Sequence, residues 1–75
     1  MKKMNALQRR RELDQTAASV NALPRQQRIE LGQHLLAKYR SKMIQSTIDR
    51  VEALARGYKI DRSLVGLIED AGIQL

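Results

Sequence analysis

Residues 24–56 read PRQQRIELGQHLLAKYRSKMIQSTIDRVEALAR, a stretch that has Pro24 at its start and Gly32 as its one glycine. Apolar residues recur in it every three or four positions, which is the spacing of one face of an α-helix. As one helix the stretch would be about 50 Å long, whereas a globule of 75 residues has a radius of gyration of about 11 Å. One unbroken helix would therefore extend beyond its own domain.

The apolar positions of this stretch form two faces, turned from each other by about 100°. The face of the first half contains Ile29, Gly32, Leu35, Leu36, Tyr39 and Met43, and that of the second half contains Ile44, Thr47, Ile48, Val51, Ala55 and Tyr58. One interpretation is a continuous helix whose halves cover different neighbours. The other is a break near Arg40 and Ser41, with Ser41 capping a new helix. Because no strong helix breaker is present, we favour the continuous helix.

A first helix is predicted over about residues 5–20. Asn5 is a residue type that caps helices at the N-terminus, and Pro24 suits the start of the next helix because its missing N–H has no partner there anyway. The predicted buried stripe of the first helix contains Ala6, Leu13, Ala17 and Val20. This helix therefore joins the central stretch through a short turn.

A last helix is predicted over about residues 62–71. Gly57 is suited to ending the central stretch, Asp61 to capping the last helix, and Gly72 to ending it in the left-handed conformation. Strand patterns are nearly absent. The sequence thus predicts an all-α protein, a single helical domain over residues 1–75. It would be a small bundle of three helices, or four if the central helix breaks.

Positive charge is concentrated in the first part of the chain. Residues 1–42 carry ten Lys and Arg against three Asp and Glu, whereas residues 43–75 carry four against five, for a net charge of +6. Arginine outnumbers lysine by nine to five, and a guanidinium group can hold a phosphate with two parallel hydrogen bonds. Such asymmetry is typical of a surface that binds a polyanion.

The basic half predicts a small nucleic-acid-binding regulatory protein that contacts the phosphate backbone. Tyr39 and Tyr58 are the only aromatic residues, so contact with a duplex backbone is preferred to stacking on single-stranded bases. A solvated basic surface that binds nothing is the plainer interpretation, and it stays open. The candidate nucleic-acid-binding residues are Arg9, Arg10, Arg11, Arg25, Arg28, Lys38, Arg40 and Lys42.

The last predicted helix is apolar on more than one side and therefore needs burial on more than one side. Its candidate protein interface consists of Leu64, Val65, Leu67 and Ile68. The alternative function is accordingly a helical protein-binding adaptor or inhibitor that acts through this helix. The same helix and the long central helix also predict a homodimer or a stable complex with another protein.

A helix-turn-helix is the less favoured arrangement for this region. Ala53 and Gly57 have the four-residue spacing of that motif, and a recognition helix would begin near Arg62. The apolar side chains that follow leave few groups able to read base edges.

No catalytic site is expected. The chain has no Cys, His34 is its one histidine, and it contains no Gly-rich phosphate loop, so we expect no enzyme activity, no cofactor and no metal site. An interfacial membrane helix would call for Trp or Phe, and neither occurs, so no membrane contact is expected. Without Cys, and without an apolar segment after the N-terminal lysines, a cytoplasmic location is expected.

Overall fold

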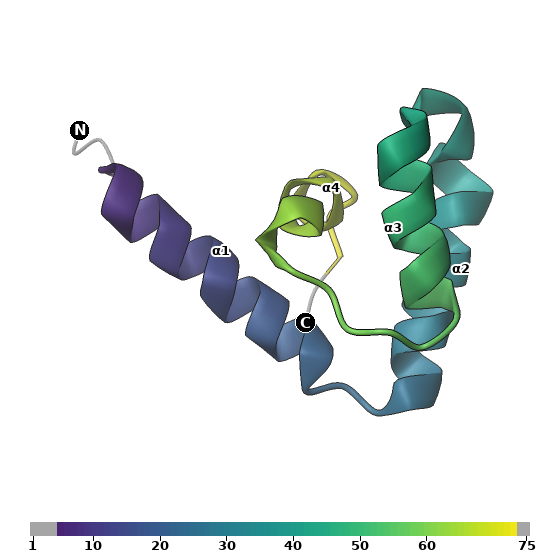
Figure 1. Cartoon of the computed structure of the whole chain (residues 1–75), viewed down its shortest axis with the longest axis horizontal. Helices are drawn as coiled ribbons and strands as arrows, with labels where there is room; N and C mark the ends of the chain where they lie inside the picture. Colours follow the sequence, from purple (N-terminus) through teal and green to yellow (C-terminus); the bar gives the residue numbers. More distant parts are fainter. Residues whose placement is uncertain (1–4, 74–75) are drawn as a thin grey trace.

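The computed structural model describes residues 5–73 and contains helices and no strand over that range (Figure 1). The four α-helices are α1 (Ala6–Asn21), α2 (Arg25–Tyr39), α3 (Gln45–Ala55) and α4 (Val65–Asp70). Two short 3₁₀ helices, η1 (Arg40–Lys42) and η2 (Arg62–Leu64), precede α3 and α4. The predicted all-α class is confirmed, with the four helices expected if the central helix breaks.

The start of α1 is determined locally. Asn5 has an extended backbone, its side chain accepts a hydrogen bond from the Gln8 amide at 2.8 Å, and the Gln8 side chain accepts one from the Asn5 amide at 3.3 Å. This reciprocal capping box satisfies two amides that have no partner within the helix. Along the predicted stripe Ala17 and Val20 are buried, whereas Ala6 is exposed. Only the C-terminal half of α1 therefore packs against the core.

The favoured continuous central helix is wrong. The α-helix ends at Tyr39, η1 follows, and Met43 and Ile44 are extended before α3 begins. The break lies where the alternative interpretation placed it, but Ser41 lies within η1 and does not cap α3. Ile44 stands at the N-cap without a side-chain hydrogen bond.

The break lets α2 and α3 fold back on each other as an antiparallel hairpin (Figure 1). Gly32 allows the two backbones to approach closely, because a Cβ atom at this position would lie about 2.6 Å from the Ala55 Cα atom. The hairpin buries Leu35, Val51 and Leu54 completely. In a continuous helix Leu35 could not pack against Val51 and Leu54. The burial gained by the hairpin therefore favours a break, even though the sequence has no local helix breaker.

The C-terminal segment lies between the hairpin and α1 (Figure 1). Asp61 caps η2 as predicted, by accepting a hydrogen bond from the Ser63 amide at 2.9 Å. Gly72 has the predicted left-handed conformation, with φ of 68°. One core cluster draws on all four helices and η2, and it contains Val20, Leu35, Val51, Leu54, Leu64 and Ile68.

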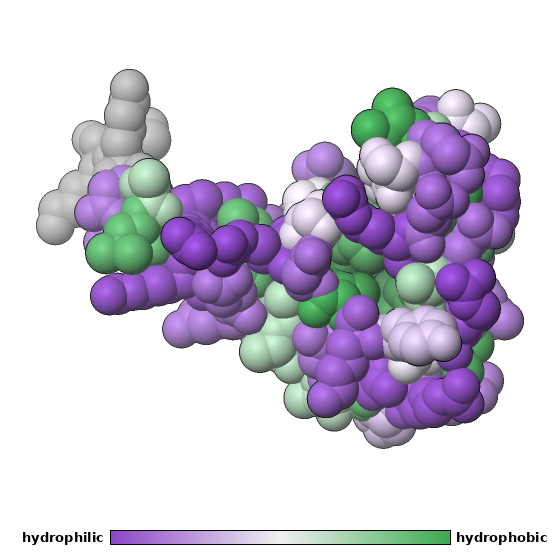
Figure 2. Space-filling model, viewed as in Figure 1, coloured by the Kyte–Doolittle hydropathy of each residue, from purple (hydrophilic) through white to green (hydrophobic). Residues whose placement is uncertain are grey.

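Helices α2 and α3 form an antiparallel pair, whereas α1 does not pack beside them. Helix α1 packs mainly on η2 and α4 and diverges from the α2–α3 hairpin, so its N-terminal half projects from the body (Figure 1). The radius of gyration is 12.6 Å, above the value of about 11 Å for a compact chain of this length. Figure 2 shows that the projecting half of α1 is mostly hydrophilic apart from an apolar patch near its end, and that further apolar surface lies between α1 and the hairpin.

Candidate functional site

The turn after α3 has a rigid backbone built around a glycine. Gly57 adopts φ of 94°, its amide donates to the Leu54 carbonyl at 2.8 Å, and the Tyr58 amide donates to the Ala53 carbonyl at 3.1 Å. These two bonds are the Schellman arrangement that ends many helices. The turn therefore ends α3 at a defined residue, and Arg56, Tyr58 and Lys59 flank its glycine.

Two arginines from the first turn of α2 reach the same turn. The Arg25 Nη2 atom donates to the carbonyl of Arg56 at 3.0 Å, and the Arg28 Nη2 atom donates to the carbonyl of Gly57 at 3.0 Å. Arg28 also donates to the carbonyl of Leu23 at 2.6 Å, so it is half-buried and links three segments. The antiparallel hairpin thus brings the start of α2 beside the end of α3. We call Arg25, Arg28, Arg56, Tyr58 and Lys59 the turn cluster.

The turn cluster has no carboxylate partner. The ion pairs of the described residues are Arg9–Glu12, Arg9–Glu69, Arg40–Glu52 and Arg62–Asp14, and none includes a member of the cluster. Asp61 lines a shallow hollow together with Lys59, but its carboxylate accepts hydrogen bonds from Ser63 instead. A hydrogen bond to a carbonyl leaves the charge of a guanidinium in place. Four basic side chains therefore border one turn, and none of them forms an ion pair with a carboxylate of residues 5–73.

An exposed aromatic ring lies within this positive surface. Tyr58 is 62% exposed, and the Arg56 guanidinium carbon lies 5.9 Å from the centre of its ring, within the range of a cation–π contact. Sequence reasoning missed Arg56, Tyr58 and Lys59 as site residues. The signal was the run RGYK at residues 56–59, a glycine stop flanked by basic and aromatic residues.

Two of the predicted nucleic-acid-binding arginines outside the cluster form ion pairs. Arg9 Nη2 lies 2.8 Å from a Glu69 carboxylate oxygen, and this hydrogen bond, with the attraction of the Glu69 charge, raises the pKa of Arg9. Arg40 Nη2 lies 3.6 Å from Glu52. Arg9 joins α1 to α4, and Arg40 joins η1 to α3, so both charges are partly neutralised within the fold.

The remaining predicted residues, Arg10, Arg11, Lys38 and Lys42, are exposed and form no ion pair with any described residue. Arg10 and Arg11 lie on the projecting half of α1, whereas Lys38 and Lys42 lie near the loop of the hairpin. About 20 Å of helix separates Lys38 from the start of α2. The eight predicted residues therefore lie in three places, and only Arg25 and Arg28 belong to the turn cluster.

The predicted protein interface lies in the core of this fold. Leu64, Val65 and Ile68 are 2%, 0% and 1% exposed, and Leu67 is half-buried against the core. The apolar sides of α4 are covered by α1 and the hairpin, which explains why this short helix is apolar on several sides. The interpretation of these four residues as a docking surface is corrected accordingly.

The exposed residues of α4 also do not suit a DNA-recognition helix. Gly66, Glu69 and Asp70 are its exposed residues. Two carboxylates would repel phosphates, and a glycine has no side chain to reach a base edge. These three exposed residues therefore offer α4 no group suited to reading base edges.

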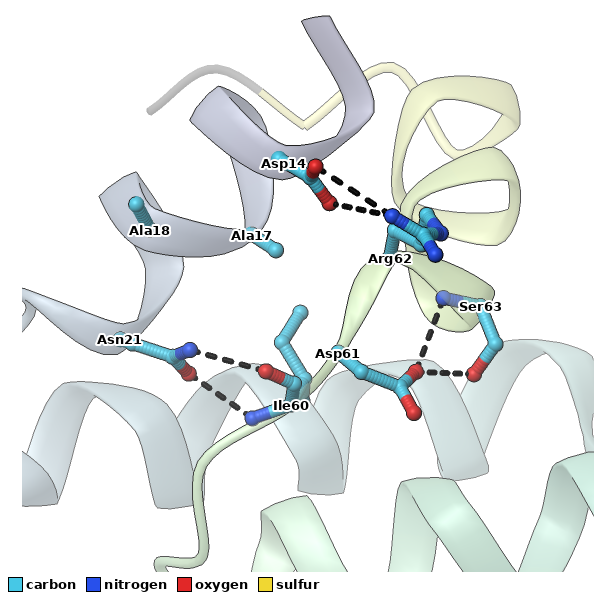
Figure 3. Close-up of a pocket in the computed structure, with 8 residues that line it drawn as sticks. All are labelled: Asp14, Ala17, Ala18, Asn21, Ile60, Asp61, Arg62 and Ser63. Carbon is cyan, nitrogen blue, oxygen red and sulfur yellow. Dashed lines mark hydrogen bonds and ion pairs between the residues drawn. The ribbon is translucent and has the colours of Figure 1, made fainter. Parts of the chain in front are cut away.

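A cavity of about 470 Å³ lies between α1 and the segment that precedes α4 (Figure 3). Its lining residues are Asp14, Ala17, Ala18, Asn21, Ile60, Asp61, Arg62 and Ser63. Its polar side chains pair with one another or with backbone: Arg62 with Asp14, Ser63 with Asp61, and Asn21 with the Ile60 backbone. These bonds connect α1 to the C-terminal segment and leave no side chain in Figure 3 aimed at a ligand.

Among residues 5–73, no three His, Asp or Glu side chains lie close enough to hold a metal ion. Within the same range, no helix combines the length and apolar character that crossing a bilayer requires. Comparison of the chain with protein-family models, with curated proteins and with solved structures finds no match.

Proposed function

We propose that the protein is a small nucleic-acid-binding regulatory protein that contacts phosphates through the turn cluster. The observation that carries the proposal is that Arg25, Arg28, Arg56 and Lys59 border one turn and have no carboxylate partner among the residues that the structure describes. A surface of this kind attracts polyanions and gains free energy by releasing their counterions.

The members of the cluster have different roles in this proposal. The guanidinium groups of Arg25 and Arg28 hold the turn by their carbonyl contacts and contribute charge. The side chains of Arg56 and Lys59 are exposed and donate no hydrogen bond to another described residue, so in this proposal they are the groups that contact phosphate oxygens. Arg10 and Arg11, in the N-terminal half of α1, are exposed but lie apart from the turn cluster, so they form a separate group of charges. The proposed activity is binding, not catalysis.

The alternative of an adaptor that acts through its C-terminal helix is not carried forward, because that helix is buried. The same correction removes one reason to expect a homodimer, and the broken central helix removes the other. Outside the turn cluster, the large exposed apolar residues of the described range are Leu7 and Ile44, which lie on different elements. Single apolar side chains scattered in this way are normal for a protein surface.

Fluorescence anisotropy with labelled duplex DNA, duplex RNA and a single strand, at low and physiological salt, tests the proposal. The double variant Arg56→Ala/Lys59→Ala removes two charges from the turn cluster, and Lys38→Ala/Lys42→Ala removes two from the far end of α2. Both variants have the same net charge. We expect binding that weakens with salt, and a log–log salt slope that is smaller by about 2 in the first variant alone.

The outcomes separate three situations. Absence of binding to every probe at low salt would contradict the proposed function. Equal weakening by the two variants would mean that total charge, and not the turn cluster, determines binding. The expected result is that Arg56→Ala/Lys59→Ala weakens binding and that Lys38→Ala/Lys42→Ala leaves it unchanged. Circular dichroism of both variants checks that each remains helical.

A further inference from the structure

Resting on the nucleic-acid binding proposed above, we infer that Tyr58 stacks on an unpaired base, so that the turn cluster selects single-stranded over duplex nucleic acid. The inference replaces the sequence-based preference for a duplex. It depends on the position of the ring, on its exposure and on the charges around it.

The two Schellman turns of the chain differ in the residue that follows the glycine. After Gly72, the Ile73 amide donates to the Ile68 carbonyl, and the Ile73 side chain packs against the core, as is usual for this position. After Gly57 the equivalent residue is Tyr58, whose ring remains 62% exposed. The backbone motif is the same, but here the apolar contact is not made. The ring lies exposed on a hydrogen-bonded turn.

The two tyrosines show the same contrast. Tyr39 packs against the core cluster, whereas Tyr58 does not. Arg56 lies over the Tyr58 ring at 5.9 Å and occupies only one side of it. The exposed side of the ring offers a flat apolar surface on which a base can stack. Every base has such a surface, so this contact needs no particular sequence.

The surroundings of the ring suit a flexible strand. Arg25 lies against Gly57, where a Cβ atom would fall about 2.6 Å from the Arg25 Nε atom, so this guanidinium and Arg56 both border the turn that carries the ring. Lys59 follows the ring directly in the chain. An aromatic ring beside cations that track a phosphate backbone is the common arrangement for binding single strands. In a duplex the base faces are covered by their neighbours, so the ring cannot stack without disrupting the helix.

Tyrosine fluorescence provides a direct readout, because the chain has no Trp and only two Tyr. Unlabelled oligothymidylate of about 12 nucleotides and a duplex of the same length are titrated into the wild-type protein. We expect the single strand to quench tyrosine emission and the duplex to leave it nearly unchanged. The variant Tyr58→Leu loses this quenching, whereas Tyr39→Phe keeps it.

Affinity for a labelled single strand and a labelled duplex is then measured by anisotropy for Tyr58→Leu and Tyr58→Phe. Removing the ring weakens binding to the single strand about tenfold and leaves duplex binding unchanged, whereas Phe keeps the ring and the affinity. Equal binding of both probes, with no effect of Tyr58→Leu, would overturn the inference and leave the proposed function standing. No binding to either probe would contradict both.

Discussion

The side-chain amide of Asn21 pairs with both backbone groups of Ile60. The Asn21 Nδ2 atom donates to the Ile60 carbonyl, and the Ile60 amide donates to the Asn21 Oδ1 atom, each at 2.8 Å (Figure 3). The two residues are 39 positions apart in the chain. One amide group therefore connects the end of α1 to the segment that follows the turn cluster, and both residues are half-buried.

Substituting Asn21 destabilises the fold. Asn21→Ala leaves both half-buried backbone groups of Ile60 without a partner and lowers the free energy of unfolding by about 1–3 kcal/mol. Asn21→Asp costs at least as much, because a carboxylate accepts from the Ile60 amide but repels its carbonyl oxygen. Urea denaturation followed by circular dichroism measures both. Ser19→Ala, which removes a hydrogen bond confined to α1, is the control and changes stability by under about 0.5 kcal/mol.

Adding a methyl group at Gly32 forces α2 and α3 apart. The new Cβ atom would lie about 2.6 Å from the Ala55 Cα atom, so Gly32→Ala lowers the free energy of unfolding by about 1–3 kcal/mol. Gly66→Ala is the matched control, since nothing lies within 4 Å of the added atom and alanine favours a helix. It leaves stability unchanged or raises it by up to about 1 kcal/mol. Similar denaturation midpoints for the two variants would contradict the close approach of the hairpin.

The buried position of α4 is tested by two isoleucines of opposite exposure. Ile68 is 1% exposed and Ile44 is 71% exposed. Ile68→Val lowers the free energy of unfolding by about 0.5–1.5 kcal/mol and Ile68→Ala by about 2–5 kcal/mol. The corresponding changes at Ile44 stay within about 0.5 kcal/mol. If the Ile68 variants were as stable as the wild type, α4 would not be buried, and its interpretation as a protein interface would stand again.

Stability depends on pH through the cap of η2. The Ser63 hydroxyl and amide donate to the Asp61 carboxylate and lower the pKa of Asp61 from its ordinary value of 3.8. The contribution of this carboxylate to stability is therefore present above about pH 4 and disappears as the pH falls through the lowered pKa. The difference in free energy of unfolding between wild type and Asp61→Asn should shrink on acidification. Ser63→Ala removes one donor and should weaken this dependence, whereas a difference constant from pH 7 to pH 2 contradicts the assignment.

Helix boundaries with a local chemical cause could be predicted from the sequence. Asn5 and Asp61 accept hydrogen bonds from amides two or three residues later, and such bonds involve only neighbouring residues. Gly57 and Gly72 take the positive φ that ends a helix, and Pro24 precedes α2 directly. The charge asymmetry was visible too, although it placed the candidate site across the whole basic half.

The sequence by itself determined the helical class, the caps and the helix stops, because these depend on groups within a few residues of one another. The tertiary structure alone decided the break after Tyr39, since no local breaker is present and the folded hairpin buries Leu35 against Val51 and Leu54. The tertiary structure also buried the apolar side chains of α4 in the core. It brought the start of α2 beside the turn after α3, since only the antiparallel hairpin places those two ends together. Burial and charge clustering depend on contacts between distant residues, which no local pattern records.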